Sequence, residues 1–297
     1  MNFIGLTQRV PQPGETVTGE RFYTAPGGKG ANQAVAASRM GGPVRMVGRV
    51  GRDTFGPALL EGLRRDGIDV SGIAEDPDNP SGIAIILLDG KRQNYIVQVR
   101  GANLHCDATQ LQAAKAAMRG ARALMIQLEL PFSVTLEAAR HAKANGVLVV
   151  WDPAPPMEPV KTAYRAVDVL TPNQNEAQFL TGIEVTGPET ARKAAEALVA
   201  AGVSMVVVKL AEQGACYASK REQGYVQGFK VDVVDTIGAG DAFGGALTVA
   251  LAEGRPVSEA VRWGCAAGAL AVTKPGAQGA MPMRAEVEAL LARSPSR

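Results

Sequence analysis

The stretch "DTIGAGDAFGGAL" (235–247) places a bare glycine turn and a carboxylate at the start of an apolar, helical segment. The first backbone N–H groups of a helix have no partner within the helix, and the helix dipole makes that end positive. Glycine lets a ligand approach such amides closely. The amides of residues 238–241 are therefore a candidate site for a phosphoryl group whose negative charge grows during transfer.

Asp241 needs its own explanation, because its charge would repel a bound anion. A carboxylate at this place fits a base that accepts the proton of an attacking hydroxyl group. The structural alternative is that Asp241 caps the helix after a tight turn. This segment alone leaves both interpretations open.

Composition restricts the class of protein. The 297 residues are 46% apolar and 20% charged, as in ordinary globular proteins, and a net charge of +2 gives no reason to expect nucleic acid or an anionic membrane as partner. No apolar run approaches the ~20 residues of a membrane span. The three cysteines form no Cys-x-x-Cys pair and the two histidines lack a ligand cluster. We therefore expect a cytoplasmic protein without a disulfide framework or a zinc site.

Short apolar runs alternate with helical patterns through most of the chain. The strand-like runs are 44–50, 123–128, 147–151, 167–170 and 205–210, and the helical segments are 30–41, 54–66, 107–119, 133–145, 188–201, 240–253 and 257–272. Runs that are apolar throughout favour strands covered on both faces. The alternation predicts a largely parallel sheet with helices on both sides.

Two regions break this rhythm. Residues 3–25 are predicted to form short strands around the turn "PQPGE", and residues 83–99 a hairpin around Asp89-Gly90. Two small β pieces beside a large α/β body predict a lid or an oligomer contact. The expected organisation is an interrupted α/β core, 26–297, with a β lid made of 3–25 plus 82–101.

A second glycine-rich stretch, "APGGKGANQAVAASRMGG" (25–42), leads into another helix. Lys29 and Asn32 offer hydrogen-bond donors beside a positive helix end, which would suit a polyhydroxylated ligand such as a sugar. The alternative is a glycine loop shaped only for tight packing. Neither this stretch nor 235–247 matches the P-loop or the dinucleotide fingerprint.

Three further polar residues stand at candidate positions. Asn173 and Glu176, in "TPNQNEAQFLTG" (171–182), share one helix face and would reach a phosphate or a metal-bound water. They equally match a capping box. Glu129 ends a predicted strand, where ligand sites of α/β proteins lie, although a single surface acid would look the same.

Taken together and in this order, these segments resemble the ribokinase family, the PfkB-type carbohydrate kinases, over nearly the whole chain. The resemblance is carried by "GGKGANQA" and "DTIGAGDAF", and the longer run "PGETVTGERFYTAPGGKGANQAVAA" is closer to kinases of ribose than to those of fructose or adenosine. It implies a three-layer αβα sandwich with a mostly parallel central sheet and a small β lid. It also implies transfer of the γ-phosphoryl group of ATP to the 5-hydroxyl of D-ribose.

The resemblance also assigns roles. Asp241 would be the base, and the amides of Gly238, Ala239 and Gly240 the anion hole. The sugar-binding residues would be Asn2, Gly28, Lys29, Gly30, Ala31, Asn32, Glu129 and Asp241. The ATP-binding residues would be Asn173, Lys209, Leu210, Ala211, Glu212, Gln213, Gly214, Gly240 and Cys265. Glu176 would act on Mg²⁺ through water, and an activating K⁺ would lie near Asp235, Ile237, Ala271, Lys274, Gly276 and Ala280. Two lids would form a homodimer contact.

Three positions depart from the family pattern. The sequence begins inside the motif that ends the family's first strand, with Asn2 in the place of a sugar-binding Asp. We therefore expect a central strand and a sugar ligand to be missing and two strand edges to lie open, from a mis-set start codon or a truncated gene. Ala211 replaces a glycine and is expected to crowd the nucleotide loop. Ala280 replaces a frequent serine, which bears on potassium dependence.

Two alternatives to a ribose kinase stay open. One is a kinase for deoxyribose, fructose or a nucleoside. The other is an inactive sugar- or nucleotide-binding relative that lost catalysis with the first strand. The polar residues expected in the lid favour a free sugar over a nucleoside: Arg21, Lys91, Arg92 and Gln93.

Overall fold

The main sheet of the protein has six strands, which all come from the part of the sequence between residues 123 and 227. The computed structural model describes residues 1–91, 93–157 and 161–294, so Arg92 of the expected lid lies outside the described residues. The strand order is β12-β11-β10-β9-β8-β7, with bounds β7 Ala123–Ile126, β8 Leu148–Trp151, β9 Val169–Leu170, β10 Met205–Lys209, β11 Gly214–Ser219 and β12 Gln223–Gln227. Strands β7 to β10 are parallel, and β11 and β12 extend the sheet in antiparallel fashion.

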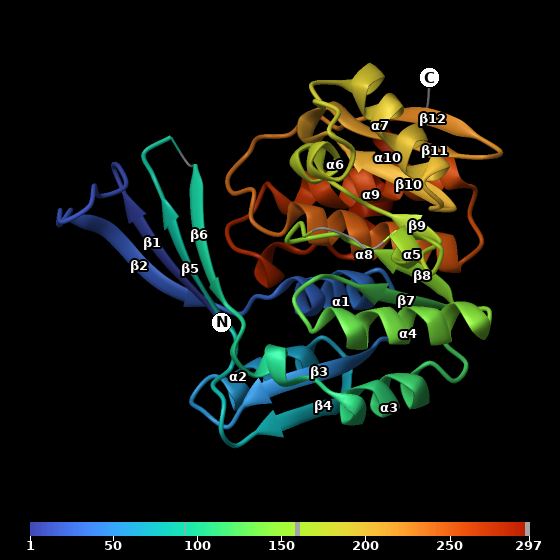
Figure 1. The fold of residues 1–297 in the computed structure, drawn as a ribbon. Coiled ribbons are helices and arrows are strands. Elements are labelled where there is room, and N and C mark those ends of the chain that lie inside the picture. Colours follow the sequence, from blue (N-terminus) through green and yellow to red (C-terminus); the bar gives the residue numbers. More distant parts are fainter. Residues whose placement is uncertain (92, 158–160, 295–297) are drawn as a thin grey trace.

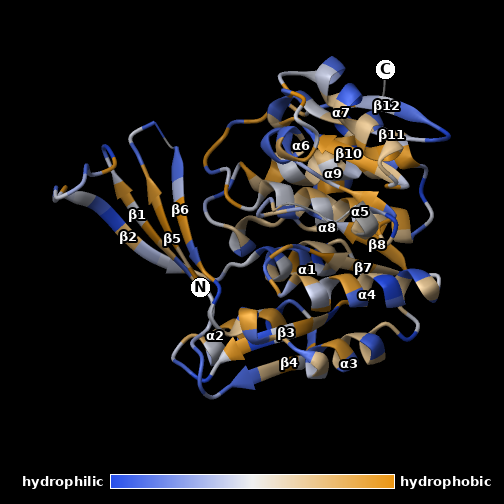
Figure 2. Cartoon of the chain, viewed as in Figure 1, coloured by the Kyte–Doolittle hydropathy of each residue, from blue (hydrophilic) through white to orange (hydrophobic). Residues whose placement is uncertain are grey.

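Helices cover both faces of this sheet. One apolar cluster joins Val207 of β10 to helices α1 (Lys29–Arg39), α8 (Ala239–Ala252) and α9 (Val257–Ala271), whereas Val206 and Val208 belong to a second cluster with α4 (Phe132–Ala144) and α7 (Pro188–Ala200). The three valines are fully buried and alternate between the clusters, as successive side chains of a strand must. In Figure 2 the hydrophobic colour accordingly concentrates on these strands. The predicted αβα sandwich is confirmed.

A second, two-stranded sheet lies beside β7. Strand β3 (Arg45–Gly51) pairs in parallel with β4 (Asp69–Asp76), and α2 (Gly56–Arg65) connects them. Among the described residues no strand joins β3 to β7, so the helical layers hold two separate sheets (Figure 1). The two sheets together form the layer between the helices, and β3 and β7 each have one unpaired edge in the described structure.

A third sheet, which we call the outer sheet, stands away from the body (Figure 1). Its order is β2-β1-β5-β6, with bounds β1 Asn2–Thr7, β2 Gly19–Ala25, β5 Ile83–Leu88 and β6 Asn94–Val99. The two small β pieces predicted from the sequence thus form one sheet, in which β1 and β5 pair in parallel.

The remaining helices complete the layers. Their bounds are α3 Ala108–Ala117, α5 Lys161–Tyr164, α6 Gln174–Thr181 and α10 Arg284–Arg293, with 3₁₀ turns at Gly101–His105, Ala211–Gln213 and Gln278–Ala280. The sequence patterns did not predict β4, β11, β12 or α10. In the described part of the chain no helix has the length and apolarity needed to cross a membrane.

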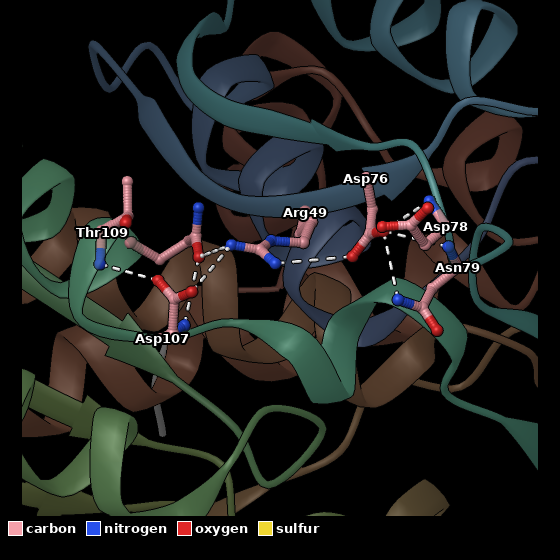
Figure 3. Close-up of polar contacts among 7 residues, drawn as sticks. Arg49, Asp76, Asp78, Asn79, Asp107 and Thr109 are labelled. Atoms are coloured by element: carbon pink, nitrogen blue, oxygen red, sulfur yellow. Dashed lines mark hydrogen bonds and ion pairs between the residues drawn. The ribbon is translucent and has the colours of Figure 1, made fainter.

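A polar cluster centred on Arg49 ties β3 to its surroundings (Figure 3). The guanidinium contacts the carboxylate of Asp76, at the end of β4, at 3.4 Å and that of Asp107, the N-cap of α3, at 3.3 Å. Asp76 in turn accepts hydrogen bonds from the backbone of Asp78 and Asn79, which lead toward β5. This cluster fixes the β3–β4 unit to α3 and to one of the two connections of the outer sheet.

Candidate active site

Two helix N-termini converge at the centre of the molecule. Helix α1 begins after Gly28 (φ 95°) and α8 after Gly238 (φ 80°), left-handed conformations that glycine adopts without strain. The helices pack closely, because a Cβ on Gly245 of α8 would lie only 2.5 Å from the Cβ of Ala36 of α1. Both positive helix ends therefore face one site.

Asp241 lies in the first turn of α8 and points to α1. Its Oδ2 accepts a hydrogen bond from Asn32 Nδ2 at 2.8 Å, and its Oδ1 accepts one from Gln33 Nε2 at 3.1 Å. The capping interpretation of Asp241 is wrong, since Gly238 is the N-cap residue and the carboxylate bonds to the neighbouring helix. Burial raises the pKa of Asp241 above its ordinary value, while Lys29 acts in the opposite direction. A carboxylate with a raised pKa accepts a proton more readily.

Gln33, Asp152 and Lys209 form a chain of contacts behind Asp241. Gln33 Nε2 also donates to Asp152 Oδ2 at 2.9 Å, and Lys209 Nζ donates to Asp152 Oδ1 at 2.9 Å. The ammonium group lies beside the start of α8, because a Cβ on Gly240 would be 3.5 Å from it. Sequence reasoning missed Asp152 and Gln33. Asp152 directly follows a predicted strand, so the argument applied to Glu129 would have found it.

Lys29 and Glu129 face the outer sheet. The backbone N–H of Lys29 donates to Glu129 Oε2 at 3.1 Å, and Gln98 of β6 donates to the other carboxylate oxygen. Burial raises the pKa of Glu129, with Lys29 opposing it. For Lys29, burial alone would lower the pKa, but the charges of Asp241, Asp152, Glu176 and Glu129 outweigh it and the net pKa is raised. Lys29 thus interacts with four carboxylates, two of which, Asp152 and Glu176, also interact with Lys209.

Several expected sugar-binding residues line one cavity of about 760 Å³, namely Asn2, Gly28, Gly30, Ala31 and Glu129. The side chain of Asn2 lies against Gly27, where a Cβ would come within 2.3 Å of Asn2 Nδ2. Among the described residues Asn32 Oδ1 is buried without a hydrogen-bond partner, although Asn32 Nδ2 is engaged. A buried acceptor without a donor is costly, and a ligand hydroxyl would satisfy it.

Asn173 and Glu176 form the capping box of α6. The backbone N–H of Asn173 donates to Glu176 Oε2 at 2.8 Å, and the N–H of Glu176 donates to Asn173 Oδ1 at 2.9 Å. A backbone bridge joins Asn173 to Lys209, whose ammonium group lies beside Gly240, so the start of α6 lies near the N-terminus of α8. Burial raises the pKa of Glu176, and Lys209 opposes the rise.

The expected nucleotide loop follows Lys209 as a 3₁₀ turn, Ala211–Gln213. Ala211 has φ 52°, a left-handed conformation that glycine would adopt at lower cost, so the departure from the family pattern strains the loop by roughly 1 kcal/mol. Gly214 tolerates no side chain, because a Cβ would lie 2.0 Å from Val226 O. Two members of the expected ATP set lie in the core: Leu210 is fully buried and Cys265 is 7% exposed.

The residues expected around a monovalent cation are partly brought together. Asp235 accepts hydrogen bonds from the backbone of Ile237 at 3.0 Å and of Gly276 at 2.8 Å. Lys274 pairs with Glu286 of α10, while Ala271 and Ala280 are fully buried. Within the described ranges no group of three or more His, Cys, Asp or Glu side chains is placed to hold a metal ion.

The chain resembles known proteins over most of its length. The model of the pfkB family carbohydrate kinases matches residues 1–284. A ribokinase from Haemophilus influenzae is 38% identical over 93% of this chain and 90% of its own, and a deoxyribokinase from Salmonella typhi is 31% identical over 95% and 92%. A structure of an Arabidopsis thaliana ribokinase complexed with ribose and ATP superimposes with a TM-score of 0.87 at 31% identity, covering 98% of this chain and 95% of that one.

Proposed function

Because this chain belongs to the PfkB family of carbohydrate kinases, we propose that it phosphorylates D-ribose at the 5-hydroxyl with ATP as phosphoryl donor. The observation that carries the proposal is the buried carboxylate of Asp241 at the N-terminus of α8, hydrogen-bonded to the first turn of α1. The similar ribokinase with bound ribose and ATP supports this choice of substrates.

In the proposed reaction Asp241 accepts the proton of the sugar hydroxyl as that oxygen attacks the γ-phosphorus, and ADP leaves. The amides of Gly238, Ala239 and Gly240 stabilise the charge that develops on the phosphoryl oxygens. Lys209 adds a positive charge next to Gly240 while Asp152 holds it in place. Glu129 and Asn32 orient the sugar from the side of α1.

Two cations are part of the proposal. Magnesium bound with ATP would neutralise phosphate charge, and the buried carboxylate of Glu176 would hold one of its water ligands by a hydrogen bond. For a monovalent cation, potassium, we propose the segments that Asp235 draws together, 235–237 and 271–276. We place the reaction in the cytoplasm, in keeping with three buried cysteines that are all free thiols.

The direct test is ADP release by the 297-residue chain from ATP and Mg²⁺ with D-ribose, 2-deoxyribose, fructose or adenosine, each with and without K⁺. We expect the largest kcat/KM with D-ribose and higher turnover with K⁺. A preference for 2-deoxyribose would instead match the deoxyribokinase relative. Ribose-dependent thermal stabilisation without ADP release from any acceptor would favour the inactive, ligand-binding alternative.

We further propose that the outer sheet is a lid and carries a homodimer contact. Gln98 of β6 reaches Glu129, so the sheet already touches the sugar side of the site. One face of this sheet is apolar and exposed: Phe22 and Val97 are each more than half exposed, and Ile85, Tyr95 and Val99 lie on the same face, which is unusual for a free surface. Sedimentation of the chain is expected to give twice the monomer mass, and Phe22→Lys with Val97→Glu to give the monomer. A monomeric unmodified chain at micromolar concentration would contradict the contact.

A further inference from the structure

Gln33 is a neutral side chain enclosed between two carboxylates. It lies on α1 and is 1% exposed, and Asp241 and Asp152 beside it are also buried. Its Nε2 donates to Asp241 Oδ1 at 3.1 Å and to Asp152 Oδ2 at 2.9 Å. An amide nitrogen carries two hydrogens and ionised carboxylates only accept, so this one group serves both acids at once.

The opposite end of the same amide is held by Gln127, which directly follows β7. Gln127 Nε2 donates to Gln33 Oε1 at 2.5 Å. If the Gln33 amide turned over, its oxygen would face two carboxylates and its amino group would face that of Gln127. All three hydrogen bonds would be lost at a buried place, which is costly, so the surroundings favour the one orientation observed.

Charges of both signs surround Asp241 in the described structure. They belong to Lys29 of α1, Glu129 after β7, Asp152 after β8, and Lys209 of β10, which pairs with Asp152 at 2.9 Å. Lys29 lowers the pKa of Asp241, whereas Asp152 raises it and adds to the larger effect of burial. A donor to the ionised carboxylate therefore influences how much of Asp241 is ready to accept a proton.

The orientation of Gln33 matters once Asp241 has taken up the proton of the sugar hydroxyl. A protonated carboxyl group can donate a hydrogen bond, and a glutamine that turned its oxygen toward it would stabilise the protonated form. Asp152 and Gln127 oppose that turn, because each would lose its bond to Gln33. Gln33 is thus held in the orientation that favours the ionised carboxylate, which is the form that begins each turnover.

We propose that Gln33 is a positioning residue of the phosphoryl transfer and that Gln127 acts through it. Gln33 holds Asp241 in place and favours its ionised form, and Gln127 keeps Gln33 from turning over when Asp241 is protonated. This inference rests on the proposed function, in which Asp241 is the base. The amide of Gln127 bonds to Gln33, so its effect on the base passes through Gln33.

The first test is Gln33→Met, which keeps the length of the side chain and removes its donors and its acceptor. On the acid side of the pH profile we expect kcat/KM for ribose to fall about tenfold, an upward shift of the acid limb by about one pH unit. On the alkaline plateau it should stay within about threefold. Gln127→Met is expected to shift the limb in the same direction by about half a pH unit. Gln127 is only half-buried, so this variant keeps the test available if Gln33→Met does not fold.

A double variant separates action through Gln33 from two independent effects. If Gln127 acts only through Gln33, the two substitutions together shift the limb no further than Gln33→Met alone. Gln110→Met is the matched control, since Gln110 is also a buried glutamine, 3% exposed, and accepts from Arg49 at 2.6 Å. It is expected to leave the limb in place. Additive shifts, or an unshifted limb in Gln33→Met or in Gln127→Met, would overturn the proposal.

A titration without substrate keeps this result apart from the proposed function. In protein labelled with ¹³C at the aspartate carboxyl groups, the resonance of Asp241 is the one that Asp241→Asn removes. We expect its pKa to rise in Gln33→Met and in Gln127→Met by the same amounts as the acid limb. These shifts in a chain that phosphorylates no sugar would support the coupling of Gln127 to Asp241 and contradict the kinase reaction. Their absence from an active chain would overturn the coupling alone.

Discussion

Asp241→Asn is expected to lower kcat for ribose phosphorylation by about 10³-fold, with the KM for ribose changed by less than about threefold. The amide cannot take the proton of the attacking hydroxyl, yet it keeps the size and most contacts of the carboxylate. Gln33 Nε2 can still donate to the remaining oxygen. Asn32 Oδ1, which has no partner among the described residues, can accept from the new amide after rotation of the Asn32 side chain.

The same substitution is expected to leave the protein at least as stable at pH 7. Burial raises the folded-state pKa of Asp241 above its unfolded value of about 4, so the ionised carboxylate opposes folding. That opposition is absent below the unfolded pKa and grows as pH rises through the folded pKa. Removing the charge should therefore raise the melting temperature near neutral pH.

Steady-state kinetics and thermal unfolding of the same preparation check both statements. Thr248→Val in the middle of α8 is a suitable control, since within the described residues the Thr248 hydroxyl donates to Gly244 O of the same helix and makes no bond to Asp241. A kcat within tenfold of the unmodified chain would remove Asp241 from the role of base. A lower melting temperature would show that the carboxylate stabilises the fold.

Lys29→Met is expected to lower kcat/KM for ribose by about 10²-fold at pH 7 and to move the acid limb of the pH profile upward by about one pH unit. Lys29 is the cation that counteracts the burial of Asp241 and Glu129. Without it both pKa values rise further. Because the base must be ionised, activity lost on acidification is then lost at a higher pH.

Lys29→Arg is the matched variant, because it keeps the positive charge and should keep the acid limb where it is. Profiles of kcat/KM between pH 5 and 9 separate the two effects. A fall in activity with an unshifted acid limb would mean that Lys29 only contacts the sugar. An unshifted limb in Lys29→Met together with unchanged activity would exclude the residue from the site.

The layers of the fold were predictable because buried strands and amphipathic helices carry their own periodicity. Strand β10 is apolar in every core position, and its pattern alone identified it. Strand β12 alternates between exposed and half-buried residues without burying any, β4 buries only its last residue, and both carry charged or polar residues at many positions, so neither gave such a signal. Helix α10 mixes charged residues around its circumference and buries only Val287, so its pattern was equally weak.

The residues of the candidate site likewise include some that the sequence alone identified and some that it did not. Asp241, Lys29 and Asn32 stand in glycine-rich segments whose local chemistry identifies them. Gln33 could not be found from its surroundings in the sequence, because its role depends on Asp152 and Asp241, residues 119 and 208 positions away. Tertiary contacts of this kind, in which a neutral amide joins two carboxylates, leave no local pattern.

The division of the sheet into two parts also matters before the native state is reached. While the chain folds, the edges of β3 and β7 form within apolar surroundings and offer ready templates to the same segments of another chain. Crowded synthesis at high temperature would thus convert part of the newly made protein into intermolecular aggregates. The break in the sheet would therefore lower the yield of native protein more than it lowers the catalytic rate.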